Sequence, residues 1–277
     1  FIARWSRVGS RTGASASGPR QMPADLSDRA PLAKLLYRSR KGGEQGPLPE
    51  NAVTDMTGAL SCQLSVLGLF EAAGDRLGGW KVGLSTGRSL DALGEGFRPF
   101  GFIPKSRILA AGQTVDVSAI SDCRIEPELC LIIGQALSGH GLDEDAVRAG
   151  ICAIAPAFEI NDVRVGMKAN PPLFVADGLA NWGMVVGPAC PVPSGEMRPR
   201  VSLFKDDEVI AETDESMPAD GPLLAVSRLC AQLAQFGLGL KPGDRVITGS
   251  YSQDRVTGGT GYGAVFEDIG EVSVTFS

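Results

Sequence analysis

From residue 80 to the C-terminus, short apolar runs are separated by glycine, proline and aspartate, and this pattern limits the possible folds more than any other feature. Short apolar runs bounded by turn-forming residues are typical of β-strands. The runs do not alternate regularly with helical stretches, so we do not expect a doubly wound parallel sheet. The pattern predicts a β-rich body with strands near residues 80–84, 101–103, 129–133, 153–160, 183–187, 200–204, 208–211, 245–248 and 271–276.

The part of the chain before residue 80 has a different pattern. Leucine recurs at helical spacing over about residues 24–41 and again over about residues 50–73, with glycine and proline between the two stretches. Residues 1–23 contain four arginines and no acidic residue, and we expect a disordered tail or a leader there. The predicted organisation is therefore this tail, a small helical N-terminal part over 24–79, and a large β-rich domain over 80–277.

Two helical stretches interrupt the β-rich domain, over about residues 142–150 and 221–237. Asp143 and Asp220 precede them and are candidate N-caps, because aspartate side chains accept hydrogen bonds from the first free amides of a helix. The predicted fold class is α+β.

Composition excludes several classes of function. A formal net charge of −6 argues against nucleic-acid binding, which requires clustered basic residues. No apolar run reaches eighteen residues, so no membrane span is expected. The only histidine is His140, which leaves no site built from several imidazoles. The six cysteines form no C-x-x-C pair, and we expect reduced, mostly buried thiols and a cytoplasmic location.

The segment Arg124-Ile-Glu-Pro-Glu-Leu-Cys-Leu-Ile-Ile133 is the strongest candidate for a functional site. Side chains alternate along a strand, so Glu126 and Glu128 are predicted to point to the same side. Two neighbouring carboxylates repel each other unless a positive charge lies between them, and hard cations prefer oxygen ligands. The alternative is a solvent-facing strand with two exposed acids, and Pro127 is compatible with a strand edge or a bulge.

Two further charged residues lie in apolar surroundings. Glu159 belongs to an otherwise apolar run, where a carboxylate is costly to bury without a metal ion or a basic partner. Lys81 lies in Gly79-Trp-Lys-Val-Gly-Leu84, where it could act as an acid or base, or extend its charge to solvent along an apolar stem.

Two glycine-containing segments invite a ligand interpretation. Thr248-Gly-Ser250 follows an apolar run and could present hydroxyl and amide groups to a ligand, or could form a simple turn. The glycine-rich stretch over 257–263 is not a dinucleotide-binding loop, because it leads into a strand and no helix follows it.

Taken in order, six short motifs resemble the 2-keto-4-pentenoate hydratase and 4-oxalocrotonate decarboxylase branch of the fumarylacetoacetate hydrolase superfamily. The resemblance runs from about residue 30 to the C-terminus. The motifs are Lys81-Val-Gly-Leu-Ser, Ile125-Glu-Pro-Glu-Leu, Phe158-Glu-Ile-Asn-Asp-Val-Arg164, Val175-Ala-Asp-Gly178, Gly243-Asp-Arg-Val-Ile-Thr-Gly-Ser250 and Ile269-Gly-Glu-Val-Ser-Val-Thr-Phe276.

The resemblance implies a mixed β-roll catalytic domain, a homo-oligomer, and a lyase that acts on a small 2-oxo or 2-hydroxydienoate acid in aromatic-compound catabolism. It implies Mg²⁺ or Mn²⁺ bound by three glutamates, a catalytic lysine, and a group of substrate-binding residues. These are Glu126, Glu128 and Glu159 for the metal, Lys81 for catalysis, and Leu84, Asp177, Thr248 and Ser250 for the substrate.

The sequence departs from the hydratase pattern at two positions. Pro99 occupies the position of an aspartate in a Pro-Asp-aromatic-Gly stretch, and Gly178 replaces the asparagine of Ala-Asp-Asn. The expected reaction is addition of water to a 2-hydroxy-2,4-dienoate. The alternatives are a decarboxylase or a C–C hydrolase on the same scaffold, and a paralogue that binds metal and 2-oxo acids without turnover.

Overall fold

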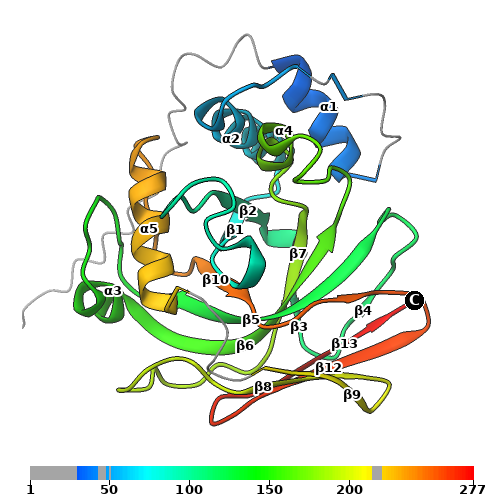
Figure 1. Cartoon of the computed structure of the whole chain (residues 1–277), viewed down its shortest axis with the longest axis vertical. Coiled ribbons are helices and arrows are strands. Elements are labelled where there is room, and N and C mark those ends of the chain that lie inside the picture. Colours follow the sequence, from blue (N-terminus) through cyan, green and yellow to red (C-terminus); the bar gives the residue numbers. More distant parts are fainter. Residues whose placement is uncertain (1–29, 43–47, 50, 214–219) are drawn as a thin grey trace, which may run out of the picture.

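The computed structural model describes residues 30–42, 48–49, 51–213 and 220–277. The tail or leader predicted over 1–23 lies outside the described residues, and the division of the chain into domains stays a prediction. Two mixed β-sheets and a small set of helices make up the described fold (Figure 1). The predicted α+β class is confirmed.

The larger sheet has eight strands, in the order β2-β1-β10-β5-β6-β7-β3, with β11 paired to β5 beside this path. Its two long central strands pair antiparallel, whereas β1 pairs parallel to β10 and β3 parallel to β7. The strands are β1 (Leu77–Val82), β2 (Phe100–Pro104), β3 (Ile108–Ala110), β5 (Cys123–Ile133), β6 (Ile151–Asp162), β7 (Asn181–Val186), β10 (Arg245–Ser250) and β11 (Asp254–Arg255).

The smaller sheet packs against the larger one at the end of the molecule opposite α1 and α2 (Figure 1). Along β13 every second residue is buried, which is typical of a strand with one solvated face. Its five strands follow the order β4-β13-β12-β8-β9, and they are β4 (Thr114–Val115), β8 (Val201–Lys205), β9 (Glu208–Thr213), β12 (Thr260–Phe266) and β13 (Gly270–Phe276).

The helices cover the other side of the larger sheet (Figure 1). α1 (Ala30–Arg40), α2 (Met56–Ala72) and the short α4 (Pro171–Ala176) lie together, and α3 (Glu144–Gly150) lies beside α5 (Pro222–Ala234). Their apolar side chains and those of the sheet form the main core, which contains Phe70, Trp80 and Phe100. Two short 3₁₀ turns, η2 (Gly87–Ser89) and η3 (Lys105–Arg107), lie in the connections after β1 and β2.

One of the two N-cap predictions is confirmed. The Asp143 carboxylate accepts a hydrogen bond from the Ala146 amide at 2.8 Å, and α3 begins at the next residue. The prediction for Asp220 is wrong, because α5 follows Gly221 without a side-chain cap. The Asp220 carboxylate is already engaged with two arginines, so it is not available to the helix amides.

The cysteines behave as expected for isolated thiols. No disulfide joins them, and four of them, Cys62, Cys123, Cys130 and Cys230, are buried. Among the described residues, no helix has both the length and the apolar character that a membrane crossing requires.

Candidate metal centre and its pocket

The register of the two central strands brings three glutamates together. Glu126 on β5 is the direct antiparallel partner of Glu159 on β6. Glu128 lies two residues further along β5, on the same face as Glu126. One carboxylate oxygen from each residue lies within 4.8 Å of the others. Glu128 and Glu159 are buried, which places negative charge in a site where water cannot screen it.

A proline in a central strand requires a break in the hydrogen-bond ladder, because it has no amide hydrogen. β5 lies between β10 and β6, and its ladder with β10 shifts register between Ile247 and Ser250, the partners of Cys130 and Glu128. Pro127 follows directly, between the end of this ladder and the start of the pairing with β11 at Ile125. Of the two alternatives predicted for Pro127, the irregularity beside a site is therefore correct, and the edge strand is not. The same irregularity allows the Gly249 amide to donate to the Glu128 carboxylate at 2.7 Å.

The Glu159 carboxylate has two buried donors. Lys81 Nζ on β1 lies 2.8 Å from Glu159 Oε2 and 2.7 Å from Oε1. Asn181 Nδ2, at the start of β7, donates to Glu159 Oε1 at 2.7 Å. Lys81 Nζ also donates to the main-chain carbonyl of Leu179 at 3.2 Å. Gln253 Nε2 donates to Glu126, so each of the three carboxylates has at least one donor.

The charges of the cluster are not balanced by protein groups. Burial, followed by the charge of Glu159, raises the pKa of Glu126 to about 7, and the same causes raise the pKa of Glu128 well above its ordinary value. Burial lowers the pKa of Lys81, but the three carboxylates together outweigh burial and raise it. With all three carboxylates ionised, they and the Lys81 ammonium carry a formal charge of −2, so an oxygen-preferring divalent cation such as Mg²⁺ or Mn²⁺ fits this donor set.

A cavity of about 330 Å³ opens beside the cluster, and both Lys81 and the glutamates of β5 line it. One part of its wall is apolar and contains Val163, Met167, Phe174, Leu179 and Ala180. Another part carries hydroxyl groups, from Ser85, Thr86, Ser89 and Ser250. Pockets that combine an apolar wall with a few convergent polar groups are typical small-molecule sites.

The segment after β1 packs tightly on the end of β10. Leu84 lines the cavity with a φ of 58°, and Ser85 Oγ donates to the Thr248 carbonyl at 3.0 Å. Gly249 has a φ of +130°, and a Cβ there would lie 2.5 Å from Ser85 Oγ. Glycine is therefore required at the centre of Thr248-Gly-Ser250, both for its backbone conformation and for this close approach.

Comparison with known proteins finds relatives whose sequences align with most of this chain. No protein-family model matches. The chain is 28% identical over 235 residues to the 2-hydroxyhexa-2,4-dienoate hydratase of Comamonas testosteroni, covering 83% of this chain and 88% of that one. It is 27% identical to a 4-oxalocrotonate decarboxylase of a Pseudomonas species (79% and 86% covered) and 26% identical to 2-keto-4-pentenoate hydratase 1 of Dechloromonas aromatica (91% and 98% covered).

Solved structures show the same fold. The 4-oxalocrotonate decarboxylase of Pseudomonas putida G7, complexed with magnesium and adipate, superposes with a TM-score of 0.83 at 22% identity, over 93% of this chain and all of that one. A fumarylpyruvate hydrolase of Pseudomonas aeruginosa, in complex with Mn²⁺ and pyruvate, superposes with a TM-score of 0.54 at 19% identity, over 71% and 88% of the two chains. These relatives and this fold agree with the resemblance of the sequence motifs to the hydratase and decarboxylase branch of the fumarylacetoacetate hydrolase superfamily.

Of the substrate-binding residues that the family resemblance implied, Leu84 and Ser250 line the cavity. Thr248 is buried and its hydroxyl donates to the Leu129 carbonyl at 3.3 Å, so it supports the strand end from inside. Asp177 is not a lining residue. Arg164 donates to both of its carboxylate oxygens at 3.1 Å, and this buried ion pair leaves Asp177 no side-chain contact with the cavity.

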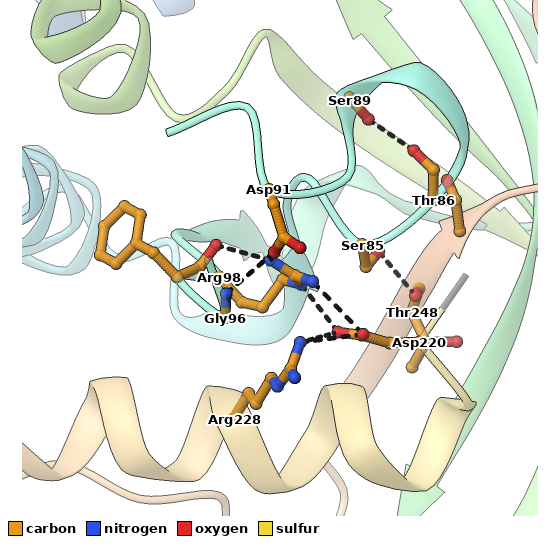
Figure 2. Close-up of polar contacts among 10 residues, drawn as sticks. Ser85, Thr86, Ser89, Asp91, Gly96, Arg98, Asp220, Arg228 and Thr248 are labelled. Atoms are coloured by element: carbon orange, nitrogen blue, oxygen red, sulfur yellow. Dashed lines mark hydrogen bonds and ion pairs between the residues drawn. The ribbon is translucent and has the colours of Figure 1, made fainter. Parts of the chain in front are cut away.

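Pro99, which occupies the position of an aspartate in the hydratase pattern, follows a buried arginine with several polar contacts. Figure 2 shows that the neighbouring Arg98 reaches Asp220 and Asp91, with distances of 2.7 Å to each carboxylate, while Arg228 approaches Asp220 from α5. Arg98 is buried, and the Asp220 amide donates to the Ser85 carbonyl at 2.9 Å. Asp220, two residues before α5, therefore holds both ends of the segment from Leu84 to Arg98, and Arg228 of α5 holds Asp220 in turn.

Sequence reasoning assigned no role at the site to Asn181, Gln253 or Arg98, and it assigned Asp220 to a helix cap instead of an ion pair. Asn181 and Gln253 lie in stretches with no charge pattern, and only the strand pairing brings them to the glutamates. For Arg98 and Asp220 a signal existed. Both lie next to a proline or a glycine outside the helices and strands, and a charged residue that is buried there requires a partner.

Proposed function

We propose that this chain is a divalent-metal-dependent hydratase that adds water to a 2-hydroxy-2,4-dienoate and yields a 4-hydroxy-2-oxo acid. The observation that carries the proposal is the buried cluster of Glu126, Glu128 and Glu159, with Lys81 bonded to it and a small cavity beside it. The relatives at 25–28% identity are hydratases and decarboxylases, which supports a lyase of this general kind.

The three glutamates would hold Mg²⁺ or Mn²⁺. Such an ion, when bound, stabilises negative charge on the C2 oxygen of a 2-oxo acid. Lys81 is the acid–base group of the proposal, because the residue lines the cavity and its Nζ contacts Glu159. Asn181 and the Leu179 carbonyl fix Glu159 and Lys81 in position, so that the proton donor is oriented before substrate enters.

The proposed reaction has two stages and consumes one water molecule. In the first, the C2 hydroxyl loses its proton and C5 gains one, with Lys81 as the group that moves the proton. The remaining C3=C4 double bond is then conjugated with the C2 carbonyl and is electrophilic at C4. In the second, water adds its hydroxyl to C4 and a proton to C3. The wall formed by Met167, Phe174 and Leu179 suits the uncharged tail of such a substrate.

A decarboxylase is the second candidate, and Arg124 is the observation in its favour. A 4-oxalocrotonate carries a second carboxylate, and Arg124 and Lys81 are the cations among the described residues that line the cavity. Arg124 already donates to Gln253 at 2.9 Å and to Asp122 at 3.1 Å, so a second carboxylate would have to compete for it. This competition is the reason that we favour the substrate with one carboxylate.

The direct test is incubation with 2-hydroxypenta-2,4-dienoate, with and without Mg²⁺, while the loss of dienol absorbance is followed. A metal-dependent loss that yields the 4-hydroxy-2-oxo acid supports the proposal. Release of carbon dioxide from 4-oxalocrotonate identifies a decarboxylase, and formation of two acids identifies a C–C hydrolase. Thermal stabilisation by oxalate with Mg²⁺, without turnover of any dienol, would identify a binding protein instead. The proposal includes a homo-oligomer, which sedimentation analysis tests.

A further inference from the structure

Arg40, the last residue of α1, reaches away from its own helix to the turn between α4 and β7. Its Nη2 donates to the Asn181 carbonyl at 3.1 Å and its Nη1 to the Asp177 carbonyl at 3.4 Å. The guanidinium also lies 4.4 Å above the ring of Phe102, and the residue is 1% exposed. Both side-chain hydrogen bonds go to main-chain carbonyls and none to a carboxylate. The free-energy cost of removing this cation from water is therefore not offset by an ion pair.

The turn that Arg40 holds is strained. Leu179 and Ala180 have φ values of 58° and 60°, directly after Gly178 at 78°. Non-glycine residues are strained in the left-handed region, so the surrounding structure must hold these two consecutive residues there. Both residues line the cavity, and the Leu179 carbonyl accepts the hydrogen bond from Lys81. Asn181, at the end of the same turn, donates to Glu159.

The departure from the family pattern at Gly178 fits this arrangement. A Cβ at this position would lie 2.3 Å from Arg40 Nη1, so a larger residue would displace the guanidinium. A small residue at 178 and a long basic residue at 40 therefore form a matched pair across the fold.

We propose that Arg40 is a positioning residue, which holds the Asp177–Asn181 turn so that the Leu179 carbonyl and the Asn181 carboxamide keep Lys81 and Glu159 in place at the metal cluster. Arg40 acts through the turn and does not line the cavity. This inference rests on the proposed function, because it assigns a role in the proposed metal site to the N-terminal helix.

The test uses Gly178→Asn, Arg40→Met and the double variant. Asparagine tolerates a positive φ, so Gly178→Asn changes the space available to Arg40 more than the backbone strain. The guanidinium is the flexible end of a side chain and can move aside, so this variant is expected to fold. Arg38→Met is the matched control, because Arg38 lies on the same helix and is exposed.

Mg²⁺ affinity is measured by calorimetry at a temperature where circular dichroism shows every variant to be folded. We expect both single variants to bind Mg²⁺ about 10-fold or more weakly than wild type, as for other changes to residues that orient ligands, and Arg38→Met to bind it normally. The double variant should be little worse than either single variant, because both changes remove the same contacts. A Gly178→Asn protein that binds Mg²⁺ with wild-type affinity would overturn the inference. The same holds if the variants have a lower melting temperature but unchanged Mg²⁺ affinity.

Hydrogen exchange of residues 177–181 supplies a second readout that requires no metal. Faster exchange of this turn in Gly178→Asn and Arg40→Met is expected, and exchange at the wild-type rate contradicts the inference even if the wild-type protein binds no divalent ion. Failure of wild type to bind Mg²⁺ counts against the proposed function instead. The two failures are therefore distinguishable.

Discussion

Glu126 of β5 and Glu159 of β6 are direct cross-strand partners in an antiparallel pair. Like charges in this position destabilise a sheet by roughly 0.2–1 kcal/mol even at a surface, and here Glu159 is fully buried. We therefore expect Glu126→Gln to raise the melting temperature of the metal-free protein and to weaken Mg²⁺ binding by about 10-fold or more. Calorimetric titration and thermal unfolding in chelator measure the two effects. Equal Mg²⁺ affinity in both proteins would rule out the metal assignment.

The metal-free protein should lose stability as pH rises from about 4.5 to about 7. Burial and the charge of Glu159 raise the pKa of Glu126 to about 7 from an ordinary value of 4.5. In this window the folded state binds more protons than the unfolded state, so the free energy of unfolding falls with increasing pH. Urea unfolding in the presence of a chelator, at a series of pH values, measures this free energy. The free energy of unfolding should fall less steeply with pH in Glu126→Gln. An unchanged pH dependence in that variant would contradict the assignment of this titration to Glu126.

Lys81→Met should separate catalysis from metal binding. Loss of the acid–base group is expected to lower kcat by about 10²–10⁴-fold. Mg²⁺ affinity should be at least that of wild type, because the variant removes a positive charge 2.7 Å from Glu159. The metal-free variant should be less stable than wild type, since Glu159 is left buried without its ion pair. Steady-state kinetics and calorimetry provide the measurements, and a variant with normal turnover would exclude Lys81 as the catalytic residue.

Gly249→Ala should damage the site through the segment that packs on it. The new Cβ would lie 2.5 Å from Ser85 Oγ and 2.6 Å from Thr86 Cγ2, and the residue has a φ of +130°. The expected cost is about 1–3 kcal/mol of unfolding free energy for the backbone alone, with more from the clash. Mg²⁺ affinity should also fall, because the Gly249 amide holds Glu128.

The matched control for this variant is Gly243→Ala. Gly243 also has a positive φ, of +91°, but a Cβ there meets no atom within 4 Å. It should therefore lose stability without losing Mg²⁺ affinity. If the two variants bind Mg²⁺ equally well, the contact with Ser85 has no influence on the site.

Arg98→Met should loosen the segment between Leu84 and Arg98. Arg98 is 1% exposed and holds Asp220 and Asp91, as Figure 2 shows. Its removal is expected to cost about 1–3 kcal/mol of unfolding free energy and to raise KM more than it lowers kcat, because the segment lines the cavity without carrying the acid–base group. Arg228→Met, which removes the partly exposed partner of Asp220, should have a smaller effect. Equal effects of the two variants on KM would argue against a special role for Arg98.

Local features of the sequence determined the parts of the fold and of the site that depend on backbone periodicity. Alternation along β5 is a property of any strand, so the common orientation of Glu126 and Glu128 followed from their spacing alone. The Asp143 cap followed from the same kind of local rule, because the side chain bonds an amide three residues away. For Glu159 and Lys81 the sequence indicated only that a charged group in an apolar run requires a partner, and the ordered family motifs supplied the grouping.

Tertiary structure decided which partner each charge receives. The register of β5 with β6 sets Glu159 opposite Glu126, and the order of the strands in the larger sheet brings Lys81 of β1 within hydrogen-bonding distance of Glu159. The family motifs implied a substrate-binding role for Asp177, and its carboxylate pairs with the buried side chain of Arg164. Asp220 was predicted to cap α5, but its carboxylate pairs with buried Arg98 instead. These contacts join residues far apart in the chain, and their geometry depends on how the whole core packs. Short-range spacing predicts the direction in which a side chain leaves its strand, but not what it meets there.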